Sequence, residues 1–596
     1  MADKDDASRT GAPGAAPSLP TLEEMQQWTW VMGRAQQLMM EFLAQQMREV
    51  KPPEPQALAQ AMPWMNMFPD PAKLAEQQVT LWTDGLSLWQ RALGFDGGKS
   101  ELAEKADRDK RFNAPQWQDN PIFDMIRQSY LLVSERLLGS VDAIEGLDPK
   151  QREKARFLTK SFVDAMAPSN FALTNPLVLE RAMETKGESL LRGLEHMLRD
   201  LSKGQLTHTD PTAFEVGRNI AMTPGKVVKR TPLYELVQFS PTTESVFETP
   251  LVIFPPWINR YYILDLNPKK SFIRWAVEQG LTVFVVSWKS ADETLAETVL
   301  DDYVLRGQID AIDTIRDLLG VESVHAIGYC VAGTTLACTL ALLAARGEAQ
   351  KVASATFFTA QIDFSEAGDL KLFIADETLD MIEQMSAEKG YLDGRYMAAT
   401  FNMLRGRDLI WNYVTSNYLL GEDYPPFDLL HWNGDTTNLP AKWHHSYLRD
   451  FYRDNKLVTG GIVVDGEPID LGKVETPTYV QAGREDHIAP AHSVWKITHH
   501  FKGPLRFVLA GSGHIAGVVN PPEAQKYQYW TNDAKVSTLE EFVAGATETK
   551  GSWWPDWIAW IGARSDKRVA AKGARTPGKG KLKAIEDAPG SYVRGR

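Results

Sequence analysis

A series of short apolar runs, rich in β-branched and aromatic residues, divides the chain after Lys203. Most of these runs are separated by stretches with helical periodicity, and each has the length of a strand. Strands that are apolar on both faces and alternate with helices predict a mostly parallel sheet, and therefore an α/β domain. The runs are YELVQF, TPLVIFPP, LTVFVVSW, SVHAIGY, SATFFTA, TPTYVQAG and LRFVLAG.

The remaining segments predict a chain of several parts. Residues 1–20 are rich in Gly, Ala and Pro and are predicted to be disordered, whereas 21–207 carries apolar residues at helical spacing and is predicted to be a helical N-terminal domain. The α/β domain is predicted over 208–564. The long interval after SATFFTA contains no obvious strand pattern, so about 361–450 is interpreted as a cap inserted over the carboxyl edge of the sheet. Residues 565–596 form a basic tail, expected to have little core of its own.

Composition argues against several classes of protein. The formal net charge of −13 is opposite in sign to the basic footprint of nucleic-acid-binding proteins. The two cysteines, Cys330 and Cys338, lie on what reads as one turn and helix, and no paired Cys/His spacing occurs, so neither a disulfide nor a metal site is expected. The N-terminus lacks the features of a secretory signal, and no apolar run is long enough to cross a bilayer, which predicts a cytoplasmic protein without a transmembrane segment.

The run SVHAIGY leads into the segment that carries the chemistry. Gly328, Cys330 and Gly333 stand between this predicted strand and the helical stretch TTLACTLALLAA, the arrangement of a nucleophile elbow with Cys in place of the usual Ser. The glycines permit a tight turn, and the helix start favours a thiolate. The backbone amide of Val331 is the predicted oxyanion donor. By analogy with the fold, a second donor is expected in the loop after TPLVIF, where Ile258 is the candidate.

A Gly-flanked Cys is more often a small buried residue than a nucleophile. Two residues later in the chain nevertheless favour the nucleophile. In the elbow fold the acid and the histidine follow the nucleophile along the chain. Asp486 comes just after TYVQAG and is the acid candidate; His514 comes just after RFVLAG and is the histidine candidate. Glu485 and His487, on either side of Asp486, are the competing residues.

Several longer motifs point to one family. GYCVAGT, YYILDLNP, FDLLHWNGDTTNLP, GREDHIAP and GSGHIAGVVNPP resemble the corresponding segments of class I polyhydroxyalkanoate synthases, and the similarity extends from about Pro115 to the ending APGSYVRGR. The resemblance implies an α/β-hydrolase-like catalytic domain that polymerises (R)-3-hydroxyacyl-CoA, with short-chain 3-hydroxybutyryl-CoA as the expected substrate, and releases CoA. It assigns the nucleophile to Cys330, the acid to Asp486 and the general base to His514.

The resemblance also implies a cellular setting. The expected partners are the growing polyester chain, the surface of cytoplasmic storage granules, granule-associated proteins and a second copy of the chain in a homodimer. No cofactor is expected, because CoA is part of the substrate and is released. One departure is visible: the family usually has Gly where this chain has Ala332, which puts the local packing of the elbow in question.

Two further residues are candidate substrate contacts. Arg405 could face the phosphates of CoA, and its alternative is a surface salt bridge. Trp432 could line the substrate path or a dimer interface, and its alternative is a buried core position. Two other functions stay open: a cysteine-nucleophile thioesterase or other hydrolase with the same triad, and a non-catalytic granule-associated scaffold.

Overall fold

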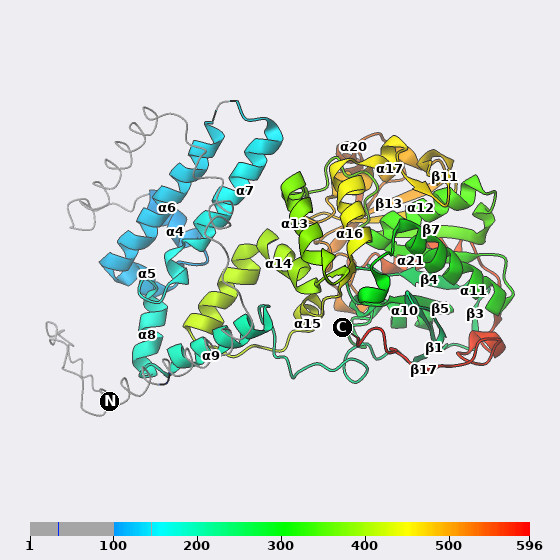
Figure 1. The fold of residues 1–596 in the computed structure, drawn as a ribbon, viewed down its shortest axis with the longest axis horizontal. Coiled ribbons are helices and arrows are strands. Elements are labelled where there is room, and N and C mark those ends of the chain that lie inside the picture. The colour runs from blue at the N-terminus through cyan, green and yellow to red at the C-terminus, as the bar shows by residue number, and fades with distance from the viewer. Residues whose placement is uncertain (1–33, 35–100, 145, 596) are drawn as a thin grey trace, which may run out of the picture. The chain divides into compact units, whose positions relative to one another are not determined.

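The computed structural model describes residues 34, 101–144 and 146–595, which fall into two compact units (Figure 1). The first unit comprises the chain up to residue 206 together with 406–423, and the second comprises 207–405 and 424–596. The predicted disordered segment 1–20 lies outside the described residues, as does all of 21–100 except residue 34.

The described part of the first unit consists of helices that begin at clear sequence signals. The side chain of Asn120 accepts a hydrogen bond from the N–H of Ile122 at the start of α6, and Asp148 and Gln151 form a capping box at the start of α7. The helices are α4 (Glu101–Arg108), α5 (Pro115–Asp119), α6 (Pro121–Asp142), α7 (Pro149–Ala165), α8 (Pro176–Glu184), α9 (Glu188–Lys203), η8 (Arg407–Trp411) and η9 (Val414–Leu419).

Residues 406–423, which the sequence placed within the predicted cap, belong to the first unit instead. They pack closely against α9. A Cβ atom on Gly193 would lie 1.8 Å from the carbonyl oxygen of Tyr418, so only glycine allows this approach. The hydroxyl of Tyr418 donates to Asp200 at 2.7 Å. This contact joins residues more than two hundred positions apart, which helical periodicity alone cannot reveal.

The second unit is built around an 11-stranded sheet with the order β15-β14-β13-β12-β7-β6-β4-β5-β2-β1-β17. The central strands from β13 to β5 are parallel to one another, and both ends of the sheet are antiparallel, so the prediction of a mostly parallel sheet is confirmed. The strands are β1 (Gly225–Arg230), β2 (Tyr234–Phe239), β4 (Leu251–Phe254), β5 (Val283–Trp288), β6 (Val324–Tyr329), β7 (Val352–Phe358), β12 (Thr478–Gly483), β13 (Leu505–Ala510), β14 (Gln528–Thr531), β15 (Thr547–Lys550) and β17 (Glu586–Asp587).

Helices cover the sheet. Helices α10 (Phe272–Glu278) and α21 (Trp554–Gly562) pack together, with the rings of Phe272 and Trp554 at 5.1 Å, and contribute to the main apolar core. Helix α12 (Val331–Ala345) is apolar all round, as a fully buried helix should be, and packs against β6 and the helical segment η5 (Asp302–Ile309).

Between β7 and β12 the chain is mainly helical, which explains why its sequence shows no strand pattern. Two pairs of short strands lie within it: β8 (Tyr391–Leu392) with β9 (Leu439–Pro440), and β10 (Val463–Val464) with β11 (Glu467–Pro468). The helical segments of this insertion in the second unit are η7 (Asp369–Phe373), α13 (Asp376–Ala387), α14 (Gly394–Leu404), α15 (Asp428–Gly434), α16 (Ala441–Tyr447), η10 (Leu448–Arg453), α17 (Lys456–Thr459) and η11 (Leu471–Lys473).

The basic tail packs onto the second unit. Strand β16 (Arg568–Ala570) pairs with β3 (Ser245–Phe247), and β17 pairs with β1 at the edge of the large sheet (Figure 1, red). Near the end of the chain Val593 is only 1% exposed. No helix in the described part of the chain combines the length and the apolar character that a membrane span requires.

Candidate active site

Cys330 occupies the turn between β6 and α12 in a conformation that side chains rarely adopt, with φ at 53° and ψ at −126°. Backbone hydrogen bonds hold the turn from both sides. The N–H of Cys330 donates to the carbonyl of Phe358 at 2.9 Å, and its own carbonyl accepts from the N–H of Gly333 at 2.9 Å. The surrounding structure therefore imposes this backbone conformation and keeps the thiol half-buried at the carboxyl end of the strand.

The two glycines of the elbow are required by close approach. A Cβ atom on Gly328 would lie 2.5 Å from the Cα of Gly333, and one on Gly333 would lie 2.3 Å from the Cβ of Ala360. Ala332, where the resemblance leads us to expect Gly, is fully buried, and its carbonyl accepts from the side chain of Gln308 at 3.0 Å. The extra methyl group is thus accommodated inside the packed turn.

Asp486 and His514 lie together at the same edge of the sheet. Strands β12 and β13 are parallel and pair Gly483 with Ala510, so the loops that follow them leave side by side. The Nδ1 atom of His514 is 2.7 Å from Oδ2 of Asp486. The other carboxylate oxygen accepts the backbone N–H groups of Ile488 and Ala489 at 2.8 and 2.9 Å. The carboxylate is therefore oriented by its own loop and directs one oxygen to the imidazole.

His514 lies beside the elbow, where the hydroxyl of Tyr329, the residue before Cys330, donates to the His514 carbonyl at 3.2 Å. Burial by itself would lower the pKa of His514, but the charges of Asp486 and of the Cys330 thiolate outweigh burial and raise it well above its ordinary value. The arrangement can take a proton from the thiol and hold it on the imidazole, which is the chemistry of an activated cysteine nucleophile.

The competing residues lie elsewhere. Glu485 is exposed to solvent, and His487 is half-buried. Burial, opposed by Asp486 and assisted by the charge of Arg405, lowers the pKa of His487. The structure thus brings Asp486, rather than Glu485, to the imidazole of His514, while the catalytic roles of these residues stay a prediction.

Comparison with known proteins assigns the family. The profile "Poly-beta-hydroxybutyrate polymerase (PhaC) N-terminus" matches residues 108–276, and "alpha/beta hydrolase fold" matches residues 250–521. The poly(3-hydroxyalkanoate) polymerase subunit PhaC of Rhizobium meliloti (strain 1021) is 45% identical over 539 residues, covering 89% of this chain and 87% of that protein. The chain belongs to the class I polyhydroxyalkanoate synthase family.

Two other relatives agree with this assignment. The poly(3-hydroxyalkanoate) polymerase of Methylorubrum extorquens is 46% identical over 532 residues, covering 88% of this chain and 87% of its own. The PhaC subunit of Cupriavidus necator is 43% identical over 532 residues, covering 88% of this chain and 89% of its own. As a member of this synthase family, the chain is an acyl-transferring enzyme, and its α/β-hydrolase fold is shown by the matching profile and by its sheet.

The oxyanion candidates of this synthase border the elbow. Val331 is the first residue of α12, where backbone N–H groups have no acceptor within the helix. Strand β4 pairs Phe254 with Gly328, so the loop containing Ile258 leaves the sheet next to Cys330. Both positions suit donors to a developing oxyanion, and which amides serve stays a prediction.

The two candidate substrate contacts differ in position. Arg405 is exposed at the C-terminal end of α14, close enough for its charge to act on His487. Trp432 is only 5% exposed, and its indole N–H donates to the carbonyl of Arg260 at 2.7 Å. Trp432 therefore occupies a buried core position, as the alternative interpretation expects. Arg405 lies at the surface near the site.

Two buried tyrosines of the insertion were missed by sequence reasoning. Burial raises the pKa of the hydroxyls of Tyr447 and Tyr452, and the charge of the nearby Cys330 raises the pKa of both further. The hydroxyl of Tyr452 accepts from the side chain of Gln361 at 3.2 Å, and Gln361 in turn accepts from Ser493 at 2.8 Å. The four-residue spacing of Trp443, Tyr447 and Phe451 indicates an aromatic helix face, but it does not indicate which part of the chain this face contacts.

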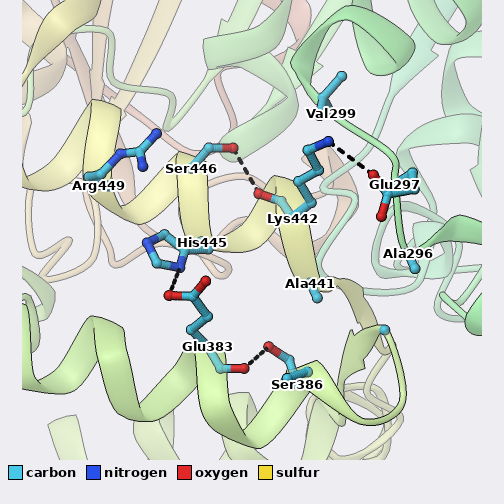
Figure 2. Close-up of a pocket in the computed structure, with 12 residues that line it drawn as sticks. Ala296, Glu297, Val299, Glu383, Ser386, Ala441, Lys442, His445, Ser446 and Arg449 are labelled. Carbon is cyan, nitrogen blue, oxygen red and sulfur yellow. Dashed lines mark hydrogen bonds and ion pairs between the residues drawn. The ribbon is translucent and has the colours of Figure 1, made fainter.

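The opposite side of α16 borders a cavity of about 560 Å³ in the synthase (Figure 2). Figure 2 shows Lys442 paired with Glu297 at 3.0 Å, and His445 with Glu383 on α13 at 3.5 Å. The predicted catalytic residues do not line this cavity. Helix α16 thus separates this charged pocket from a layer of aromatic rings near Cys330. Trp257, Trp443 and Tyr447 form this aromatic layer.

Proposed function

We propose that this synthase polymerises (R)-3-hydroxyacyl-CoA, chiefly short-chain 3-hydroxybutyryl-CoA, into polyester and releases CoA through a Cys330–His514–Asp486 triad. The observation that carries the proposal is the hydrogen bond between His514 and Asp486 at the carboxyl edge of the sheet, beside Cys330 in its strained turn. Membership of the synthase family supports the substrate and product classes, because the named relatives are poly(3-hydroxyalkanoate) polymerases.

In the first step Cys330 becomes acylated. His514 holds the thiol proton, and the thiolate attacks the carbonyl carbon of the acyl-CoA thioester. The negative charge that develops on the carbonyl oxygen is stabilised by the amides of Val331 and Ile258. The bond to the CoA sulfur then breaks, and the leaving thiolate takes the proton from His514. One thioester replaces another, so the acyl group keeps its activation.

In the second step the chain grows. His514 removes the proton of the 3-hydroxyl of the next acyl-CoA, and the oxygen attacks the acyl group on Cys330. An ester bond forms, the carbon–sulfur bond breaks, and the proton returns to the thiol. The extended chain is now a CoA thioester and reloads Cys330 by the first step. Both oxygens of Asp486 are engaged in hydrogen bonds, which supports an orienting role for this residue, so the proposal attributes the proton transfers to His514.

A polymerase must keep water from the acylated cysteine. The aromatic layer near Cys330 can serve this purpose, because its rings are closely packed. The ring centre of Trp257 lies 5.1 Å from that of Tyr447 and 5.4 Å from that of Trp443. Trp257 and Trp443 are 2% and 1% exposed. Excluding water favours attack by a substrate hydroxyl over hydrolysis.

The wider setting is part of the same proposal. Thioester exchange on a cysteine needs no electron carrier and no metal, so we expect purified protein without added cofactor to be active. We also propose action at the surface of cytoplasmic polyester granules, contact with granule-associated proteins, and a homodimer. Sedimentation of the purified protein with and without acyl-CoA tests the dimer.

Incubation of the pure protein with 3-hydroxybutyryl-CoA tests the proposed function. The expected result is release of CoA together with polymer, and a covalent acyl group mapped to Cys330 by mass spectrometry. Free hydroxy acid without polymer would favour a thioesterase. Granule formation by the Cys330→Ala variant, in cells that lack another synthase, would favour a non-catalytic scaffold.

A further inference from the structure

The C-terminal end of the chain is anchored in the core of the second unit. Val593 belongs to the main apolar cluster, which also contains Tyr261 and Tyr262. The N–H of Tyr592 donates to the buried carboxylate of Glu235 at 3.0 Å, and its hydroxyl donates to the carbonyl of Thr231 at 2.8 Å. These contacts hold the segment against β2, independently of the elbow.

One buried arginine connects this segment to the elbow side of the sheet. Arg260 is 2% exposed, and its guanidinium donates to the carbonyl of Tyr592 at 3.1 Å and to that of Gly595 at 2.6 Å. Its Nε atom lies 3.5 Å from a carboxylate oxygen of Asp435. The tail thus supplies two backbone acceptors to a cation that has almost no access to water.

Arg260 lies two positions after Ile258, in the loop that follows β4. The same loop is held at its other end, where the carbonyl of Pro255 accepts from the indole of Trp288 at 2.8 Å. A buried guanidinium that loses its acceptors must move toward water or toward new partners, because burying an unsatisfied cation is costly. Loss of the tail carbonyls would therefore displace the loop at the end nearer Ile258.

We propose that residues 588–595 hold the loop 255–260 in its active conformation through Arg260, so that the C-terminus positions an oxyanion donor of the polymerase. The inference rests on the proposed function, because the loop conformation affects catalysis only where an oxyanion forms on a thioester. Arg260 acts through the loop and is a positioning residue.

The test compares two reactions of Cys330 in the full chain and in a protein ending at Asp587. Acylation by 3-hydroxybutyryl-CoA needs an oxyanion hole, whereas alkylation by iodoacetamide needs only the thiolate. Loss of one oxyanion donor typically lowers kcat by about 10²–10³-fold. The truncated protein is expected to acylate at least about 10-fold more slowly at saturating substrate, with KM and the alkylation rate within about 2-fold of the full chain. Adding the synthetic peptide APGSYVRGR should restore acylation.

A matched control uses Arg575, a buried arginine within the tail itself. Arg575 donates to the carbonyls of Phe247 and Glu248, ahead of β4 and thus at the opposite edge of the sheet from Cys330. Arg575→Met and Arg260→Met both remove a buried guanidinium from this unit. Only Arg260→Met is expected to lower the ratio of acylation to alkylation, while both variants lower the melting temperature.

A shorter truncation, ending at Val593, removes the Gly595 acceptor but keeps Tyr592 and Val593. This variant replaces the longer truncation in the same test if the longer one does not fold. Amide hydrogen exchange gives a readout that does not depend on activity, and peptides covering 255–260 should exchange faster in either truncation. Unchanged exchange there, unchanged acylation, or a parallel loss of acylation and alkylation would each overturn the inference. A full chain that forms no acyl-enzyme would instead contradict the proposed function.

Discussion

Cys330 and Cys338 lie at the start and in the middle of the same helix, α12, yet their surroundings differ in every respect that controls a thiol. Cys330 is half-buried in a strained turn close to His514. Cys338 is fully buried, and burial raises its pKa to about 12. A thiol with that pKa is almost entirely protonated at neutral pH and is a poor nucleophile. Position at the helix end and next to an imidazole, rather than residue type, therefore determines which cysteine can react.

Replacing each cysteine by alanine is expected to give the largest difference between the two positions. Cys330→Ala should lower the rate of CoA release by at least about 10⁴-fold, because no other group in the turn can carry the acyl chain. Cys338→Ala should keep kcat within about 2-fold and only reduce the melting temperature slightly. CoA release measured for both variants, with thermal unfolding as the control, decides the matter. Comparable activity loss in the two variants would contradict the assignment of the nucleophile.

The next largest effect concerns the charge that Asp486 supplies to the imidazole. In Asp486→Asn the pKa of His514 should fall, because the neutral amide no longer stabilises the imidazolium. The thiolate–imidazolium pair then forms less readily, so the alkylation of Cys330 should need a higher pH, and kcat should drop by about 10³–10⁴-fold. Iodoacetamide rates measured against pH test this prediction. Glu485→Gln is the matched control and should leave the pH profile in place.

A smaller effect is expected from opening the aromatic layer that distinguishes the surroundings of Cys330. Trp443→Ala removes a ring that is 1% exposed and packs on Trp257, and should cost about 3–5 kcal/mol of stability. Water can then reach the acylated cysteine more easily. The ratio of free hydroxy acid to polymer should rise several-fold, as measured by product analysis. Trp443→Phe keeps an aromatic ring there and should preserve the ratio; an unchanged ratio in Trp443→Ala would contradict a role for this layer in excluding water.

The smallest effect is expected for Ala332→Gly, which restores the residue that the family usually has. Ala332 is fully buried within α12, and its carbonyl accepts a hydrogen bond from Gln308. Because glycine is less favourable than alanine within a helix, the substitution should destabilise the protein by about 0.5–1 kcal/mol. The value of kcat should change by less than about 3-fold. Denaturant unfolding and CoA release measure the two quantities, and a large gain in activity would indicate that the methyl group hinders the turn.

The elbow and its partners were predictable because they follow local rules. The glycines around Cys330 mark a tight turn, and the apolar runs before Cys330, Asp486 and His514 are the strands β6, β12 and β13. Parallel strands direct their carboxyl ends to one edge, so residues just after them are expected to meet. The distinction between Asp486 and Glu485 followed from the structure, where only the former lies against the imidazole.

The contacts that the sequence did not indicate all join distant parts of the chain. Tyr447 and Tyr452 reach the elbow from an insertion that has no strand pattern, and Tyr418 reaches Asp200 across 218 positions. Arg260 meets Gly595 across 335 positions. Periodicity and turn residues report only neighbours within a few positions, so none of these partners could be inferred from them.

The residue order alone therefore predicts the succession of strands and helices in the α/β part, the tight turn at Cys330, and the placement of Asp486 and His514 directly after two neighbouring strands. Each depends on short-range sterics, on apolar patterns or on a connection rule. Packing in three dimensions was needed to show which side chains surround the thiol, that residues 406–423 belong to the first unit, and where the C-terminus docks. Those outcomes depend on complementary packing between remote segments, and such packing has no signature in the order of neighbouring residues.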